Sequence, residues 1–285
     1  MLKNAFAYVT RKSLKSLIIL LIILSMSALS LISLSIKDAT NKASEETFGN
    51  ITNSFTMEIN RRVNQGTARG GGNVRGQDIK KIVDSGHVDN FVKRINSVAN
   101  LDDNLDIVEA PGASRNESAE RAKNFKRAVM LTGVNSSQKE TKFVSGAYKL
   151  VEGKHLTSQD KNKVLIHKDL AKKNNLKVGD KIKIKSNVYD ADNEKKANET
   201  VEVEIKGLFD GHGKSAVTYS QELYENTLIT DVHTAAKVYG NTEDTAVYQD
   251  ATFFVKGNKN LDTVIKDLGK LAINWKSYNL VKSSS

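Results

Sequence analysis

The sequence predicts an α+β protein with one N-terminal transmembrane helix and a large extracytoplasmic domain. Three observations lead to this fold class. Residues 16–36 contain no charged side chain. Strand–helix–strand patterns occur over residues 51–144 and again over 231–285. Between them, in the segment 145–230, residues 181–185 and 201–206 alternate apolar with charged side chains, as do strands of a sheet with one solvated face. We therefore expect two βαβ units with a β-rich subdomain inserted between them.

The uncharged stretch is long enough to cross a bilayer as a helix. Its apolar part begins at Leu17 and ends at Ile36, and twenty helical residues reach about 30 Å, the thickness of the hydrocarbon core. Residues 1–15 are basic and carry no acidic side chain; the basic residues are Lys3, Arg11, Lys12 and Lys15. Basic residues next to a membrane span usually stay on the cytoplasmic side. We therefore expect a cytoplasmic N-terminus and an extracytoplasmic location for residues 37–285. The span itself would contact the lipid bilayer.

A cleaved signal peptide is the alternative for the same segment. Leu17–Leu24 has the length of a signal-peptide apolar region, and Ser25–Met26–Ser27 resembles a small-x-small cleavage site. Apolar side chains continue beyond this point to Ile36, which favours an uncleaved anchor. Three serines between positions 27 and 33 share one side of the helix, where they either pack against another membrane helix or are merely tolerated.

Composition and charge exclude several other classes of protein. The mean hydropathy of −0.42 excludes a polytopic membrane protein, and the absence of cysteine excludes disulfides and thiolate metal sites. The net charge is +10, and beyond residue 36 the chain carries 39 basic and 33 acidic side chains, which leaves +6. Because basic residues are spread among acidic ones and do not form a clustered face, we expect no nucleic acid as a partner.

The first βαβ unit follows residues 37–50, which we expect to extend the membrane helix as a stalk. In residues 55–60 apolar and polar side chains alternate as in a strand, with Phe55, Met57 and Ile59 on one face. A short helix over 78–84 and strands over 88–99 and 127–134 complete the unit, with flexible loops at 64–76 and 102–124.

The second unit repeats this order near the C-terminus. Residues 251–255 read as a strand. Asn260 is a favourable N-cap residue, and apolar side chains at helical spacing follow it as far as Leu271. Residues 275–281 form the last expected strand. The helix of each unit must pack its apolar face against a sheet. We therefore expect the strands of both units to belong to one α+β domain.

The middle segment contains a short helix and a hairpin. Asp169 is placed to cap the helix. Lys181–Lys185 directs Lys side chains outward, and Val201–Lys206 directs Glu side chains outward. Opposed Lys and Glu rows favour antiparallel pairing of these two strands. Residues 186–199 form the long tip that connects them.

One glycine-rich motif resembles the end of a phosphate-binding P-loop. It spans Gly211–Ser215, but position 208 is Leu where the motif requires Gly. The residues that follow, Ala216–Tyr219, favour a strand over the helix whose N-terminus would meet a phosphate. We therefore interpret the motif as a glycine turn between strands.

The tip of the expected hairpin begins like a calcium-binding loop. Asp190, Asp192 and Glu194 occupy its first, third and fifth positions. The sixth position is Lys195 where the motif requires Gly, and the twelfth is Val201 where it requires Glu. We therefore expect a solvated tip.

The remaining polar residues form no recognisable active site. The five histidines occur without an HxH or HxxxH pair: His87, His155, His167, His212 and His233. A zinc site built from ligands distant in the sequence stays open. No serine lies in a GxSxG motif, and we expect the tyrosines at 219, 224, 239 and 248 to pack in the interior. We therefore predict no catalytic, cofactor-binding or metal-ligating residue, no cofactor and no enzyme activity.

Several segments, in order, resemble the extracytoplasmic core domain of MacB/FtsX-type ABC transporter permeases. They contain a glycine turn, a valine-rich strand, a Leu-Ala helix, a V-G-D turn and a strand that reaches a glycine, at 144–160, 164–171, 176–184 and 203–209. Residues 4–16 resemble the basic amphipathic helix that precedes the family's first membrane span. The likeness covers nearly the whole chain and is greatest to the Vex-type permeases of Gram-positive bacteria.

This resemblance implies a fold, partners and a mechanism. Family outer domains combine βαβ repeats with a β-rich insertion. The ATPase is a separate cytoplasmic chain, a second permease subunit completes a homo- or heterodimer, and membrane-helix motion is passed to the outer domains. Family permeases carry three further membrane helices after the outer domain. Since the sequence stops at Ser285, where a stalk would return to the membrane, we interpret it as an N-terminal fragment or a truncated reading frame. We expect that a chain that truly ended there would not transport alone.

Two functional hypotheses follow. The first is a permease subunit of an ABC exporter whose outer domain couples ATP-driven motion to export of a peptide or drug-like substrate. The large outer part favours export over control of cell division. The second is a single-pass cell-surface binding or sensing protein without transport activity.

Overall fold

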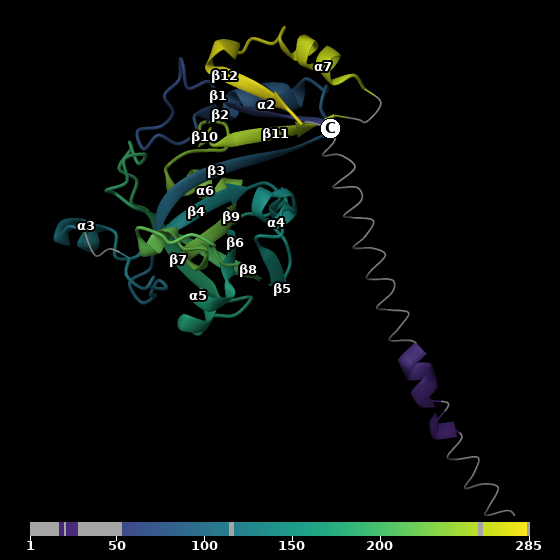
Figure 1. The fold of residues 1–285 in the computed structure, drawn as a ribbon, viewed down its shortest axis with the longest axis vertical. Helices are drawn as coiled ribbons and strands as arrows, with labels where there is room; N and C mark the ends of the chain where they lie inside the picture. The colour runs from purple at the N-terminus through teal and green to yellow at the C-terminus, as the bar shows by residue number, and fades with distance from the viewer. Residues whose placement is uncertain (1–16, 20, 28–52, 114–116, 256–258, 284–285) are drawn as a thin grey trace, which may run out of the picture. The chain divides into compact units, whose positions relative to one another are not determined.

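The fold is taken from a computed structural model of the 285-residue chain. The structure describes residues 17–19, 21–27, 53–113, 117–255 and 259–283 (Figure 1). The chain divides into two compact units, residues 1–50 and residues 51–285. Each unit is described by itself.

In the first unit the described residues, 17–19 and 21–27, are helical and expose their apolar side chains. The hydroxyl of Ser27 donates a hydrogen bond to the carbonyl of Ile23 within this helix. In the described part of the chain, no helix is both long and apolar enough to cross a membrane. Half of the predicted span from Leu17 to Ile36, including Ile36 itself, lies outside the described residues.

The second unit is built on one ten-stranded sheet. Its strands are β1 (Ser54–Ile59), β3 (Asn90–Leu101), β4 (Ala128–Val134), β5 (Lys149–Gly153), β6 (Lys163–His167), β7 (Lys181–Ser186), β8 (Val201–Asp210), β9 (Thr227–Asp231), β11 (Asp250–Phe254) and β12 (Tyr278–Lys282). Their order is β12-β1-β11-β3-β4-β9-β6-β8-β5, and β7 pairs with both β3 and β8. A small second sheet joins β2 (Val74–Arg75) to β10 (Val247–Tyr248).

Part of the large sheet closes on itself. β3 pairs with β4, β4 with β9, β9 with β6, and β6 with β8. β7 then connects β8 back to β3. Closure of this kind pairs the strands of the ring on both sides and leaves no free edge among them. Buried side chains from these strands, such as Leu131, Ile166 and Val203, belong to the main hydrophobic core.

This ring corrects the expectation of a separate inserted subdomain over residues 145–230. β5 to β9 do lie in that segment. However, β9 pairs in parallel with β4, and β7 pairs with β3, so strands from residues 51–144 belong to the same closed ring. The middle segment therefore shares the sheet and the core of its flanks. Alternation predicts that a strand exists, but it does not identify the partner strand.

The two predicted strand–helix–strand units meet in this sheet. β1 lies between β11 and β12 and is antiparallel to both. Phe55 and Met57 are fully buried, as their alternation predicted, and the ring of Phe55 stacks on that of Phe253 with centroids 5.2 Å apart. The N-cap prediction at Asn260 is confirmed, because its side chain accepts from the backbone N–H groups of Asp262 and Thr263.

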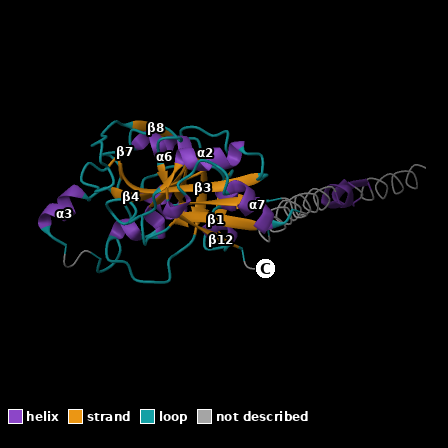
Figure 2. Ribbon diagram, turned by 90° about the horizontal axis from the view of Figure 1, so that it is seen from above, coloured by secondary structure: helices purple, strands orange, loops and turns teal. Residues whose placement is uncertain are grey.

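Helices cover this sheet and its connections. They are α2 (Gly76–Asp84), α3 (Ala119–Asn124), α4 (Thr141–Val144), α5 (Lys168–Lys173), α6 (Val232–Val238) and α7 (Leu261–Leu268), with short 3₁₀ turns η1 (Ser137–Lys139), η2 (Ser220–Glu222), η3 (Tyr224–Asn226) and η4 (Trp275–Ser277). Figure 2 shows α2 and α6 on one side of the strands. A Cβ at Gly133 in β4 would lie 2.3 Å from the Cβ of Ala235, so glycine allows α6 to pack closely on β4.

The β7–β8 hairpin has the predicted register. Lys181 lies opposite Glu204 and Lys183 opposite Glu202, while Ile182 and Val203 face each other in the core. The predicted antiparallel pairing of Lys and Glu rows is confirmed.

Two local predictions were wrong. The N-cap of α5 is His167, not Asp169: the Nδ1 atom of His167 accepts a hydrogen bond from the backbone N–H of Asp169 at 3.1 Å. Ala216–Tyr219 forms a loop and not a strand, because β8 already ends at Asp210 and the next regular element is η2.

Candidate functional site

The residues singled out in the membrane segment are not brought into a site by the structure. Leu17 belongs to the described helical residues and is 51% exposed. The other members of that group lie outside the described residues; they are Ile36, Lys3, Arg11, Lys12 and Lys15. Their roles as the ends of a span and as a positive flank remain predictions.

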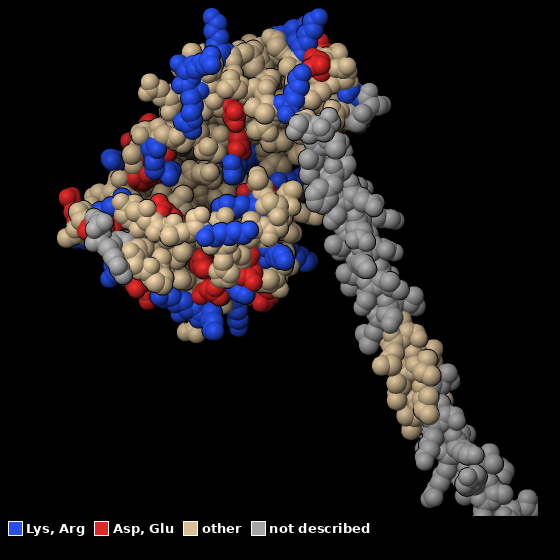
Figure 3. All heavy atoms as spheres, viewed as in Figure 1, with Lys and Arg blue, Asp and Glu red and all other residues tan. Residues whose placement is uncertain are grey.

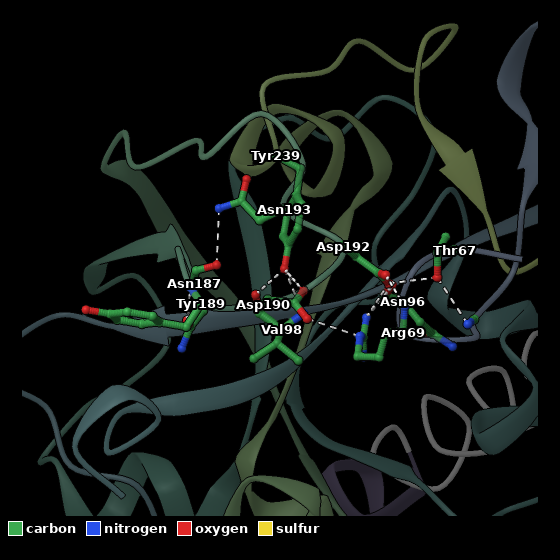
Figure 4. Close-up of polar contacts among 11 residues, drawn as sticks. Thr67, Arg69, Asn96, Val98, Asn187, Tyr189, Asp190, Asp192, Asn193 and Tyr239 are labelled. Carbon is green, nitrogen blue, oxygen red and sulfur yellow. Dashed lines mark hydrogen bonds and ion pairs between the residues drawn. The ribbon is translucent and has the colours of Figure 1, made fainter. Parts of the chain in front are cut away.

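A polar network instead connects the glycine-rich loop at 64–73 to the β7–β8 connection (Figure 4). The Nε atom of Arg69 lies 3.2 Å from Asp190 Oδ1, and its Nη2 atom lies 3.1 Å from Asp192 Oδ2. The backbone N–H of Arg69 and the hydroxyl of Thr67 also donate to Asp192, at 2.7 and 2.9 Å. Side-chain contacts therefore join the two loops. Asp190 and Asn193 of the tip are buried, whereas Glu194, Lys195 and Lys196 are exposed, as a solvated tip predicts.

Asp190 is the buried centre of this network, with 3% of its surface exposed. The hydroxyl of Tyr239 lies 2.5 Å from Asp190 Oδ2 and 2.6 Å from the carbonyl of Val98, and it accepts from the Val98 N–H at 3.2 Å. Burial, together with the negative charge of Asp190, raises the pKa of Tyr239. The hydroxyl therefore stays protonated, and its one proton points to either Asp190 Oδ2 or the Val98 carbonyl.

A polar cavity of about 440 Å³ opens beside the network. Its polar side chains include Thr67, Asn96, Ser97, Asp192, Lys195, Tyr239, Asn241 and Thr245. The Ser97 hydroxyl is buried and has no hydrogen-bond partner among the described residues. Buried polar groups without partners are uncommon, so this hydroxyl is suited to bind a water or a polar ligand. Because no base contacts Ser97 within the described chain, the cavity suits binding better than covalent chemistry.

A second polar cluster forms where β8 ends. Asp210 is the last residue of that strand, His212 follows it, and Asp169 and Glu225 come from α5 and η3. The ring of His167 lies 5.4 Å from that of His212. In the part of the chain that the structure describes, the groups of His, Asp and Glu that are close enough to share a metal ion all lie here.

The two histidines of this cluster have opposite electrostatic environments. Burial lowers the pKa of His167, which therefore stays neutral near pH 7. A hydrogen bond to Glu225 raises the pKa of His212, with support from Asp169 and Asp210. The sequence left open a zinc site built from histidines that are distant in the chain, but it did not indicate that His167 and His212 lie close together. They meet because β6 and β8 are parallel neighbours, with His167 opposite Phe209.

The charged surface is mixed. Figure 3 shows Lys and Arg side chains interspersed with Asp and Glu on the face in view. Many of these charges are paired, as in the exposed bridges Lys80–Asp84 and Lys181–Glu202. Such a surface is typical of solvated protein, and exposed pairs of this kind contribute little to stability.

Comparison with known proteins identifies the family of this fold. The family model of the MacB-like periplasmic core domain matches residues 16–270, which is most of the chain. The chain belongs to this family. The match begins where the predicted membrane span begins, and it includes the closed ring and both polar clusters. The resemblance to MacB/FtsX-type permeases is therefore confirmed.

A curated relative supports the same assignment for this MacB-like chain. It is an uncharacterized ABC transporter permease, YclI, of Bacillus subtilis, 26% identical over 310 aligned positions that cover 98% of this chain and 61% of the relative. The chain thus spans about three fifths of that permease. It contains the extracellular domain of an ABC transporter permease-like protein.

Solved structures to which this chain is similar include the periplasmic region of MacB from Actinobacillus actinomycetemcomitans. It is 17% identical, with a TM-score of 0.48, over 84% of this chain and 92% of that one. The extracellular domain of the noncanonic ABC-type transporter YknZ from Gram-positive bacteria is 11% identical, with a TM-score of 0.42, over 80% of this chain and all of that one.

Proposed function

We propose that this chain is part of the permease subunit of an ABC exporter. The observation that carries the proposal is the family match over residues 16–270. In this role residues 1–15 are cytoplasmic, 16–36 cross the bilayer, 37–50 form a stalk and 51–285 lie outside. The chain has no enzymatic role of its own, because ATP is hydrolysed by a separate cytoplasmic subunit, and a second permease subunit completes the transporter.

The pairing of β1 with β12 supports a mechanical role for the outer domain. β1 is the first strand after the predicted stalk, and β12 is the last strand among the described residues. Phe55 lies opposite Lys282, and the backbone N–H of Ser283 donates to the carbonyl of Ser54 at 2.9 Å. Both ends of the domain therefore leave from one point of the sheet. A displacement of the stalk acts on β1 and β12 together and moves the domain as one body.

Association with an ATPase tests the proposal. The full-length natural protein that contains this chain is affinity-purified from its own membranes in mild detergent. We expect an ABC ATPase chain to co-purify in a fixed ratio and to dissociate less in the presence of ATP analogues. An unrelated membrane protein with the same tag serves as the control. Recovery of the protein without any ATPase would contradict the proposal.

For the substrate we propose a peptide or drug-like molecule, because the outer part is large. The polar cavity also favours the second candidate function, a surface protein that binds or senses a ligand without transport. The two differ in one measurement. A binding protein is stabilised against heat by its ligand without any ATPase, whereas an exporter couples substrate to ATP turnover in the purified complex.

A further inference from the structure

A second cavity, of about 200 Å³, lies on the face of the sheet that α6 does not cover. Gly133 and its partner Ile95 face α6. Side chains alternate between the two faces along a strand, so Arg94 and Asn96 of β3 point to the opposite face, where they line this cavity. Because cavities for drug-sized ligands measure about 300–1,000 Å³, this one suits a smaller molecule.

Lys142 of α4 is a cation in the cavity wall without an acidic partner in contact. Its Nζ atom lies 3.2 Å from the Tyr148 hydroxyl and 4.5 Å from the centre of the Tyr224 ring. Among the described residues no carboxylate forms a salt bridge with it, and the charge of Glu140 acts on it only from a greater distance. An ammonium group has three donors. Two of them therefore remain for an acceptor inside the cavity.

Arg94 supplies another free donor to the same cavity. Its Nε atom is buried and has no acceptor in the part of the chain that the structure describes. Its other nitrogens face acids, with Nη2 at 2.6 Å from Asp250 Oδ2 and Nη1 at 3.8 Å from Glu140 Oε1. Buried donors without an acceptor are uncommon. Arg94 and Lys142 both line the cavity, so they can donate to one carboxylate bound there.

Two carboxylates balance these cations in the wall. Glu140 accepts the backbone N–H of Lys142 at 2.8 Å. Glu222 Oε2 accepts from the backbone N–H groups of Thr218 and Tyr219 at 3.0 and 3.1 Å, which leaves its Oε1 atom without a hydrogen bond among the described residues. Two positive and two negative side chains thus line the cavity. Complementary charge favours a ligand that carries both signs over a simple anion.

We propose that this cavity binds a small zwitterion, an α-amino acid, with its carboxylate at Lys142 Nζ and Arg94 Nε and its ammonium group at Glu222 Oε1. Hydrogen bonds in which both partners are charged are among the strongest in proteins. Met130 and Ile229 also line the cavity and offer an apolar wall to the side chain of the amino acid. This site belongs to the outer domain and does not depend on the proposed role in export.

A purely structural role of Lys142 is the competing explanation. In that case the rings of Tyr148 and Tyr224 hold the ammonium group through cation–π contacts, and water alone fills the cavity. The two explanations differ in their response to amino acids and to their analogues. A zwitterion site requires both charges of the ligand, whereas a solvent-filled cavity distinguishes none of them.

Calorimetry on the full chain in detergent distinguishes the explanations. L-leucine is the titrant. Its matched analogues are 4-methylpentanoate, which lacks the ammonium group, and 3-methylbutylamine, which lacks the carboxylate. We expect one L-leucine per chain and binding of each analogue that is at least about tenfold weaker, because each leaves a charged group of the site unpaired. Absence of saturable L-leucine binding, or equal binding of either analogue, would overturn the proposal.

Variants locate the ligand. We expect Lys142→Met to weaken L-leucine binding at least about tenfold, since the carboxylate loses a charged donor. Glu222→Gln, at an exposed position, should weaken binding of L-leucine but not of 4-methylpentanoate, which has no ammonium group. Lys139→Met is the matched control, because Lys139 also lies over an aromatic ring, that of Phe254, but does not line the cavity. Far-UV circular dichroism verifies that each variant folds. Unchanged L-leucine binding in folded Lys142→Met or Glu222→Gln would refute this location.

Discussion

At the scale of single residues, the hydroxyl of Tyr239 holds the β7–β8 connection to the core. It is the polar group within hydrogen-bond distance of both the buried Asp190 and the carbonyl of Val98. Removal of such a partner leaves buried polar atoms unsatisfied, at about 1–3 kcal/mol. We expect Tyr239→Phe to lower the free energy of unfolding by this amount, as measured by urea denaturation. Tyr189→Phe is the matched control, because Tyr189 is 59% exposed. Equal stability of the two variants would contradict this role.

His155 gives the domain a pH dependence. Its Nδ1 atom is hydrogen-bonded at 2.8 Å to the Ser137 hydroxyl, which also accepts the Leu156 N–H. Burial lowers the pKa of His155 in the folded state, with a smaller effect from Lys206. The unfolded chain, with an ordinary pKa of about 6.5, therefore binds a proton more readily. Stability is complete above this value and falls as the pH is lowered through and below it.

We accordingly expect the urea concentration at the midpoint of unfolding to decrease as the pH is lowered from 7.5 to 5. In His155→Gln, which cannot gain a charge, the fall should be smaller. An identical pH dependence in both chains would show that other groups are responsible.

The residues of the candidate site show where sequence reasoning ends. Asp190 and Asp192 attracted attention as an incomplete calcium motif, yet their main partner is Arg69, more than a hundred positions earlier. His167 and His212 likewise meet through strand pairing and not through spacing. Short-range sequence patterns indicate only which residues are close along the chain. To predict a site formed by residues of different strands, one must know which strands pair in the sheet.

At the scale of elements, most strands and helices could be predicted, because each is encoded locally. Phe55, Met57 and Ile59 alternate and are buried as expected, and Asn260 caps α7. Closure of the ring could not be predicted. It depends on β7 pairing with β3 and on β9 pairing with β4, and both contacts join distant segments. The same limitation made the middle segment resemble an insertion.

Close packing of α6 on β4 depends on Gly133. A methyl group there would lie 2.3 Å from the Cβ of Ala235. We expect Gly133→Ala to destabilise the domain by about 1–3 kcal/mol through overpacking. Ala235→Gly alone should lose about 1 kcal/mol of helix propensity. In the double variant the space is restored, so it should be more stable than Gly133→Ala. Additive losses in urea unfolding would contradict the contact.

At the scale of the whole molecule, we propose that the MacB-like outer domain responds to motion that begins in the membrane. The family assignment follows from the match over residues 16–270. The arrangement of β1 beside β12 then places the two ends of the domain together. In the proposed function, ATP-driven motion is transmitted to the outer domain through this junction.

Hydrogen exchange of the intact permease–ATPase complex, with and without ATP, tests this claim most directly. The hydrogen bond from Ser283 to Ser54 closes the end of the β1–β12 pair. Strand ends open more readily than core strands, so a force on the stalk alters protection there first. We predict that ATP changes exchange in residues 54–59 and 278–283 and leaves β6, in the closed ring, unchanged. An outer domain whose exchange does not respond anywhere while the ATPase turns over would contradict the account.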